Sequence, residues 1–106
     1  MKVLFDQGTP APLRKALAGH VVETAFERGW STLQNGQLIA AAEAAGFEVF
    51  VTTDRNLKYQ QNLATRTIAI VVLLTTSWPR IERQLPSVVK AIHESVPTGY
   101  VEVHIE

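Results

Sequence analysis

Two short apolar runs in this chain of 106 residues end in the same way, because each leads directly into an aspartate. The first run is Val3–Asp6 and the second is Val49–Asp54, and a stretch with helical character follows each of them. A short apolar run followed by a helix is typical of a parallel α/β sheet. The carboxyl ends of parallel strands meet along one edge of the sheet, where ligand crevices open. Asp6 and Asp54 are therefore expected to converge at that edge, as a divalent cation would require.

The rest of the chain continues the alternation of strands and helices. The run Thr67–Leu74 is almost continuously apolar, as in a central parallel strand, whereas Tyr100–Ile105 alternates, as in a half-exposed edge strand. The order βαβαβαβαβ predicts a single three-layer α/β/α domain over residues 1–106, with a mainly parallel central sheet of about five strands. The expected strands are Lys2–Asp6, His20–Thr24, Phe47–Thr53, Thr67–Leu74 and Tyr100–Ile105.

Prolines, glycines and one asparagine mark the expected helix ends. Pro10 and Pro12 suit the first turn of a helix, where a missing N–H does no harm. Asn35 is predicted to be the N-cap of the next helix, which Gly46 ends. Pro86 is expected to kink or restart the last helical region, because proline cannot donate the hydrogen bond that a helix interior needs.

Composition excludes several classes of protein. Cysteine is absent, so disulfides, thiolate metal sites and cysteine nucleophiles are excluded. Ten basic and ten acidic residues cancel, so global charge does not indicate nucleic-acid binding. The best apolar run, Ile68–Leu74, is far below the roughly 18 residues of a membrane span, and the N-terminus lacks a signal-peptide pattern. We therefore expect a cytoplasmic protein without a membrane partner. Dinucleotide-binding, P-loop and GxSxG signatures are also missing.

Several motifs occur in the order found in small PIN-like domain proteins. They are Asp6 with a proline-started helix after it, the helical segment Leu38–Ala42, and the strand Val49–Asp54 that ends in Thr-x-Asp. The chain resembles this family from Met1 to Leu74, and the last helix and strand fit the same architecture. The resemblance implies a metal-dependent ribonuclease. Small members resemble the toxins of bacterial toxin–antitoxin pairs, which implies RNA as substrate, a small antitoxin as partner and a homodimer as a plausible assembly.

In that family, acidic side chains at the strand edge hold Mg²⁺ or Mn²⁺, hard cations that prefer oxygen ligands. The resemblance places Asp6 and Asp54 at two metal-ligand positions and Asn35 beside them as a third catalytic residue. A bound metal lowers the pKa of a water that attacks the phosphodiester. Amides replace expected acids at Gln7 and Asn35. We therefore expect the site to bind one metal weakly, or only when an RNA phosphate completes the coordination shell.

Each candidate also has a structural interpretation. Asp6 and Asp54 are suited to capping the turns that follow them, and Asn35 to capping a helix. Glu43, on the same helix as Asn35, is expected to be solvated, with completion of the acidic site as the lesser alternative. Trp78 follows the fourth strand, where it would anchor the last helix in the core or stack on a base.

Four basic residues near the expected edge are candidates for contacts with the RNA backbone: Arg14, Lys15, Arg55 and Lys58. They are equally well explained as ordinary surface charges. The alternative function is a PIN-like module whose catalysis has decayed and which acts by binding protein or RNA. A phosphorylated receiver-like switch shares the strand-end aspartate, but the late strand does not end in a suitable lysine.

Overall fold

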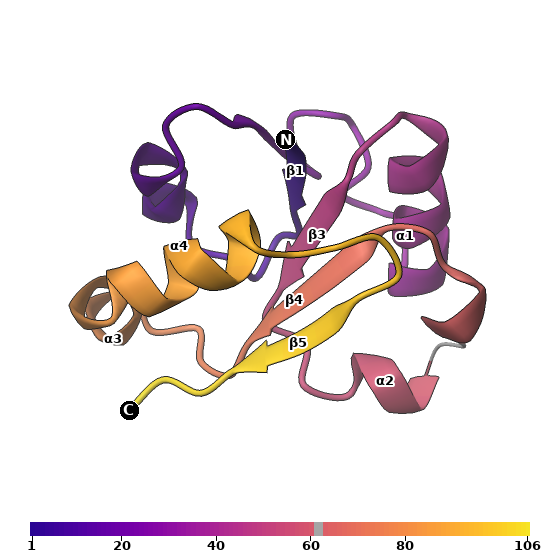
Figure 1. Ribbon diagram of the computed structural model, residues 1–106. Helices are drawn as coiled ribbons and strands as arrows, with labels where there is room; N and C mark the ends of the chain where they lie inside the picture. The colour runs from indigo at the N-terminus through magenta and orange to yellow at the C-terminus, as the bar shows by residue number, and fades with distance from the viewer. Residues whose placement is uncertain (61–62) are drawn as a thin grey trace.

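The computed structural model describes residues 1–60 and 63–106, and its strands form one sheet (Figure 1). The strand order is β2-β1-β3-β4-β5, and all four pairings are parallel. The predicted α/β fold with about five strands is therefore confirmed, and the sheet is parallel throughout. The strands are β1 (Lys2–Phe5), β2 (Val21–Thr24), β3 (Val49–Thr52), β4 (Ala69–Leu73) and β5 (Tyr100–Val103).

Helical segments connect these strands, as parallel pairing requires. Two of the segments are short 3₁₀ helices, and the others are α-helices. Within the described residues they are η1 (Ala11–Ala16), α1 (Asn35–Ala44), α2 (Leu57–Gln60), η2 (Leu63–Thr65), α3 (Trp78–Arg83) and α4 (Leu85–His93).

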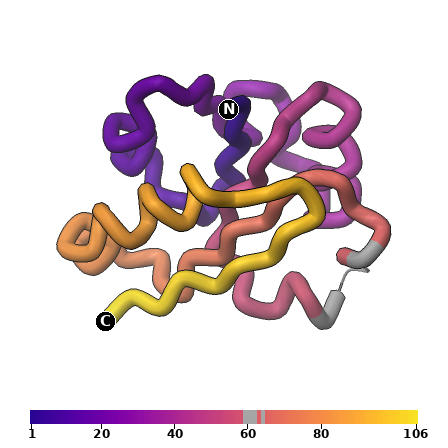
Figure 2. The backbone as a smooth tube through the Cα atoms, viewed as in Figure 1, coloured from indigo at the N-terminus to yellow at the C-terminus, as the bar shows by residue number. Residues whose placement is uncertain are grey.

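The alternation of side chains along the strands divides the core into two halves. Val3 and Phe5 of β1 belong to the half that packs against η1, α3 and α4. Leu4, between them, belongs to the half that packs against α1 and α2. Figures 1 and 2 show α4 and α1 on opposite sides of the strands. The central strands β3 and β4 are buried at every position, which completes a three-layer arrangement.

The structure corrects one predicted helix boundary and confirms another. Gln34, not Asn35, is the N-cap of α1, and its backbone N–H donates to Gln37 Oε1 over 3.3 Å. Asn35 is the first helical residue, so its side chain is available for a different contact, described below. The helical region near Pro86 restarts as expected, because α3 ends at Arg83 and α4 begins at Leu85.

The edge strand β5 was also expected from the sequence. Val103 and Ile105 are buried, whereas Val101 is 42% exposed.

Among the described residues, no helix has the length and apolar character needed to cross a membrane.

Candidate functional site

Asp6 and Asp54 lie at the same edge of the sheet because β1 and β3 are neighbours. Phe5 pairs with Val51 in the register of these two strands, and the Asp6 N–H continues the pairing by donating to Val51 O over 3.1 Å. Asp54 follows two residues after the end of β3. The sheet thus brings two aspartates that are far apart in the sequence to the same edge.

The hydroxyl of Thr52 links the two aspartates. Thr52 Oγ1 donates to Asp6 Oδ2 over 2.5 Å and accepts the Asp54 N–H over 3.0 Å. Thr52 is fully buried, whereas the two aspartates that it contacts are only partly buried. Thr52 was expected only as a residue of the strand Phe47–Thr53, although the Thr-x-Asp motif that contains it was the available signal.

The Asp6 carboxylate is held from its other side by Thr9. Asp6 Oδ1 accepts the Thr9 N–H over 3.0 Å and the Thr9 hydroxyl over 2.7 Å. Burial raises the pKa of Asp6, while the hydrogen bonds from Thr52 and Thr9 and from the backbone oppose that shift. An ionised Asp6 is therefore disfavoured by its surroundings, and a nearby cation would relieve that cost.

Asp54 is bound by two asparagines. Its Oδ1 accepts the Asn56 N–H over 3.0 Å, which closes a turn, and its Oδ2 accepts Asn35 Nδ2 over 2.5 Å. The structure therefore brings Asn35 together with Asp54. The capping interpretation is also realised, because Asp54 closes the turn to Asn56 and Asp6 closes the turn to Thr9.

A hollow of about 120 Å³ opens beside Asp6 and Asn35. The amide Gln7 also lines it, and Gln7 Nε2 donates to Ser31 O over 3.2 Å. Gly8 allows this turn to lie against β3, since a Cβ at that position would come within 2.5 Å of Thr53 Oγ1. Here we call this space the acidic hollow. Its lining residues are Asp6, Gln7, Gly8, Ala25, Trp30, Ser31, Leu33, Asn35 and Leu38.

The donor types at this edge suit a hard cation with an incomplete protein shell. In the described part of the chain, no group of three or more histidines, cysteines or acids is placed to hold a metal. What the edge offers is the carboxylates of Asp6 and Asp54 and the amide of Asn35, whose oxygen becomes a ligand if the amide turns over. Mg²⁺ commonly keeps several waters and uses one or two carboxylates together with substrate phosphate. The set is compatible with that mode of binding.

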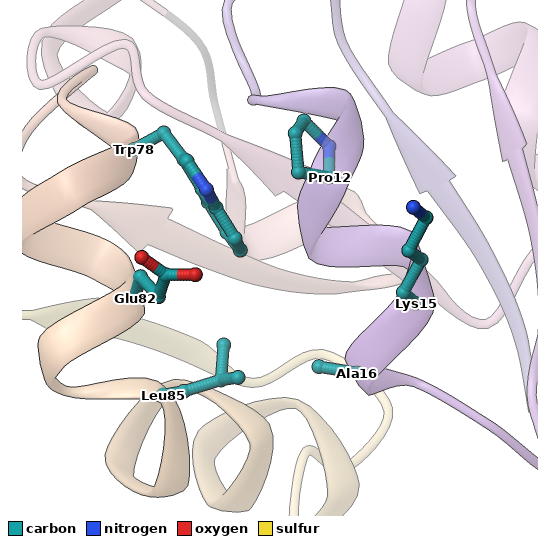
Figure 3. Close-up of a pocket in the computed structure, with 6 residues that line it drawn as sticks. All are labelled: Pro12, Lys15, Ala16, Trp78, Glu82 and Leu85. Atoms are coloured by element: carbon teal, nitrogen blue, oxygen red, sulfur yellow. The ribbon is translucent and has the colours of Figure 1, made fainter.

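The structure separates the four predicted basic residues. Arg14 forms an ion pair with Glu27, and that hydrogen bond lowers the pKa of Glu27. Lys15 lines a groove of about 410 Å³ between η1 and α3, and Trp78 and Glu82 line it from α3 (Figure 3). Neither residue lines the acidic hollow.

Arg55 and Lys58 lie together instead, in a hollow of about 290 Å³ on the β5 side of the same edge. Lys58 Nζ lies 3.1 Å from Glu102 Oε2. His104, which the sequence analysis did not select, lines the same hollow. The pattern that identifies His104 is its position just after the carboxyl end of β5.

Glu43 proves to be a structural residue, and the expectation that it is solvated is wrong. Its carboxylate accepts the Thr67 N–H over 2.5 Å, the Thr67 hydroxyl over 2.9 Å and the Ile68 N–H over 3.3 Å, and Arg66 lies 3.2 Å away. These bonds attach α1 to the segment that leads into β4. Trp78 is half-buried against the core, which supports its expected anchoring role.

Comparisons with models of known protein families, with curated protein sequences and with solved structures found no match. The PIN-like resemblance therefore rests on the order of motifs in the sequence.

Proposed function

We propose that this protein is a metal-dependent endoribonuclease of PIN-like type, with Mg²⁺ or Mn²⁺ held weakly by Asp6 and Asp54. One observation carries the proposal: the buried hydroxyl of Thr52 donates to the Asp6 carboxylate and accepts the backbone N–H of Asp54, so one atom holds aspartates from adjacent strands, and Asp6 also lines an open hollow. Turn capping alone explains each aspartate separately. It does not explain why both are fixed to the same atom.

Each residue has a distinct part in this proposal. Asp6 and Asp54 supply negative charge to the cation, and the Asn35 amide, which donates to Asp54, supplies a neutral oxygen once it turns over. Thr52 is a positioning residue, because it fixes both acids without facing the acidic hollow. A bound divalent ion supplies a water of lowered pKa and neutralises charge on the phosphate. Asp6, whose pKa is raised by burial, gains most from the positive charge.

The resemblance extends the proposal to biological context. The protein would act in the cytoplasm as the toxin of a toxin–antitoxin pair, with a small antitoxin and a second copy of itself as candidate partners. Phe26 supports a partner surface, because this large apolar side chain is 76% exposed just after the edge strand β2.

The test is an RNA cleavage assay with Mn²⁺ and with EDTA. Wild type is expected to cleave single-stranded RNA only with the metal, and Asp6→Asn and Asp54→Asn are each expected to lose about 100-fold or more of the rate, the scale on which acid–base and charge contributions operate. Glu94→Gln changes an exposed carboxylate outside the site and serves as the control. Cleavage by both aspartate variants at the wild-type rate would contradict the proposal.

A second function is favoured by a different observation. Every oxygen of Asp6 and Asp54 already accepts a hydrogen bond from the protein, so the edge is satisfied without a metal. A module that binds RNA or protein without cutting would look the same. Metal-independent RNA binding without cleavage is the result that would select this alternative.

A further inference from the structure

We propose that the hollow on the β5 side of Asp54 is a subsite for an RNA phosphate adjacent to the one at the acidic site. The RNA strand would then cross the carboxyl edge of the sheet from the acidic hollow, over Asp54, toward β5. The identity of the ligand as RNA rests on the proposed function. We call this space the phosphate hollow, and its lining residues are Arg55, Asn56, Lys58, Leu74, Glu102 and His104.

Asp54 is connected to both hollows. On one side it accepts a hydrogen bond from Asn35, which lines the acidic hollow. On the other side it accepts the backbone N–H of Asn56, which lines the phosphate hollow. Arg55 lies inside the turn that this second bond closes, and consecutive Cα atoms are only about 3.8 Å apart. The turn Asp54–Asn56 therefore lies beside both hollows.

The charges in the phosphate hollow favour an anion. Arg55 is exposed and forms no ion pair or hydrogen bond within the described part of the chain. A guanidinium is well suited to phosphate, because its planar array of donors can form paired bonds with two oxygens. His104 is also exposed and can add an N–H donor from the end of β5.

Glu102 does not cancel this preference, because its charge is already engaged. Its Oε2 accepts the Tyr100 hydroxyl over 2.9 Å and lies 3.1 Å from Lys58 Nζ. These two hydrogen bonds lower the pKa of Glu102, so it is ionised at neutral pH. Glu102 and Lys58 together form a neutral pair that shapes the wall. Arg55 is left as the uncompensated charge in the hollow.

The size of the hollow also agrees with a phosphate on a polymer. The volume of about 290 Å³ exceeds that of the acidic hollow, at about 120 Å³, so a sugar can accompany the phosphate. Phosphate contacts of this kind fix the position of a strand and carry no sequence information. We therefore infer that the phosphate hollow contributes to affinity and alignment, and not to base specificity.

The experiment measures binding of a short 5′-fluorescein-labelled single-stranded RNA in EDTA, by fluorescence anisotropy at several salt concentrations. Arg55→Gln is expected to weaken binding about fivefold and to lower the slope of log K against log salt by about 0.7, the value for one phosphate contact on a single strand. His104→Gln is expected to weaken binding about twofold, as the loss of one hydrogen bond would. Arg80→Gln, which removes an exposed arginine on α3, is the matched control and should leave binding unchanged.

A second measurement does not depend on how any variant folds. In NMR spectra of wild type, the same RNA should shift the ring signals of His104 and leave those of His93, an exposed histidine at the end of α4, in place. Equal loss of affinity in Arg55→Gln and Arg80→Gln, or equal shifts of both histidines, would overturn the inference. RNA binding that depends on Arg55, in a protein that never cleaves RNA with Mn²⁺, would overturn the nuclease proposal and leave this subsite standing.

Discussion

The side-chain amide of Asn35 donates to Asp54 Oδ2 over 2.5 Å, and this contact joins the start of α1 to the turn after β3. The amide stands where a third acid would make the edge strongly cation-binding. An asparagine there removes one negative charge from the site and supplies a donor that keeps Asp54 in place without metal. This contact therefore holds Asp54 in place at an edge that carries two carboxylates instead of three.

The contact predicts that Asn35→Asp improves metal binding. A third carboxylate adds a full charge close to Asp54, and we expect the affinity for Mn²⁺ to rise about tenfold or more, equivalent to about 1.4 kcal/mol. Without metal the variant should be less stable than wild type, because two carboxylates then face each other. Isothermal titration calorimetry and thermal melts measure the two effects.

The matched control for this variant is Gln37→Glu. It adds the same charge to the first turn of the same helix, at a side chain that bonds Gln34 and not Asp54. Equal gains in Mn²⁺ affinity for the two variants would show that general charge, and not the position of residue 35, is responsible.

Asp6→Asn is predicted to remove metal binding without reducing stability at neutral pH. Because burial raises the pKa of Asp6, the folded state holds this proton more tightly than the unfolded state does. The contribution of Asp6 to stability is therefore present below its ordinary pKa and is lost as pH rises through the folded-state pKa. Asparagine does not ionise, so the variant does not lose this stability as the pH rises. Urea unfolding from acid to neutral pH tests this. A free energy of unfolding that is lower than that of wild type by more than about 1 kcal/mol at pH 7 would contradict it.

Thr52→Val tests the bridge between the aspartates. Valine has nearly the same shape, but it leaves Asp6 Oδ2 and the Asp54 N–H without their partner. We expect a loss of about 1–3 kcal/mol in the free energy of unfolding, the cost of leaving buried polar groups unpaired. Urea unfolding measures it. Thr53→Val, one residue along, is the control, and an equal loss there would show that the bridge contributes nothing particular.

Glu43→Ala is predicted to destabilise the protein with no direct effect on the metal. Burial acts to raise the pKa of Glu43, but hydrogen bonds from Thr67, Ile68 and Arg66 outweigh it, and the net shift is downward. The stabilisation is thus present above the ordinary glutamate pKa and is lost as pH falls through the folded-state value.

We expect a cost of about 1–3 kcal/mol at pH 7 for Glu43→Ala and a smaller cost in acid. Urea unfolding at both pH values gives the comparison. Glu82→Ala, on an exposed helical position, should change little. A cost for Glu43→Ala that is the same at both pH values would contradict the assignment.

The strands could be read from the sequence because burial imposes a strong pattern. Thr67–Leu74 is apolar since β4 is covered on both faces, and the observed strand Ala69–Leu73 lies within it. The all-parallel pairing follows from the helices between strands. The convergence of Asp6 and Asp54 was predictable for the same reason, because strand order and direction fix where strand ends meet.

The details that depend on side-chain partners were not predictable. Asparagine preference predicted Asn35 as a cap, and only the resemblance placed it beside the two aspartates. Gln34 takes the cap, and Asn35 bonds Asp54. Glu43 was assigned to solvent because charged helix residues usually face water, but its partners come from Thr67 and Ile68. In both cases the deciding contact is made with a residue about 20 positions away, and local sequence preference carries no information about it.

The most direct test of the metal site is a Mn²⁺ titration followed by NMR relaxation, on wild type and on the double variant Asp6→Asn/Asp54→Asn. The account predicts selective broadening of signals from Asp6, Asn35 and Asp54 in wild type, with none in the double variant. Signals of Glu94 and its neighbours provide a reference for nonspecific binding. Uniform weak broadening at millimolar Mn²⁺ in both proteins would contradict the account and leave the two aspartates as turn caps.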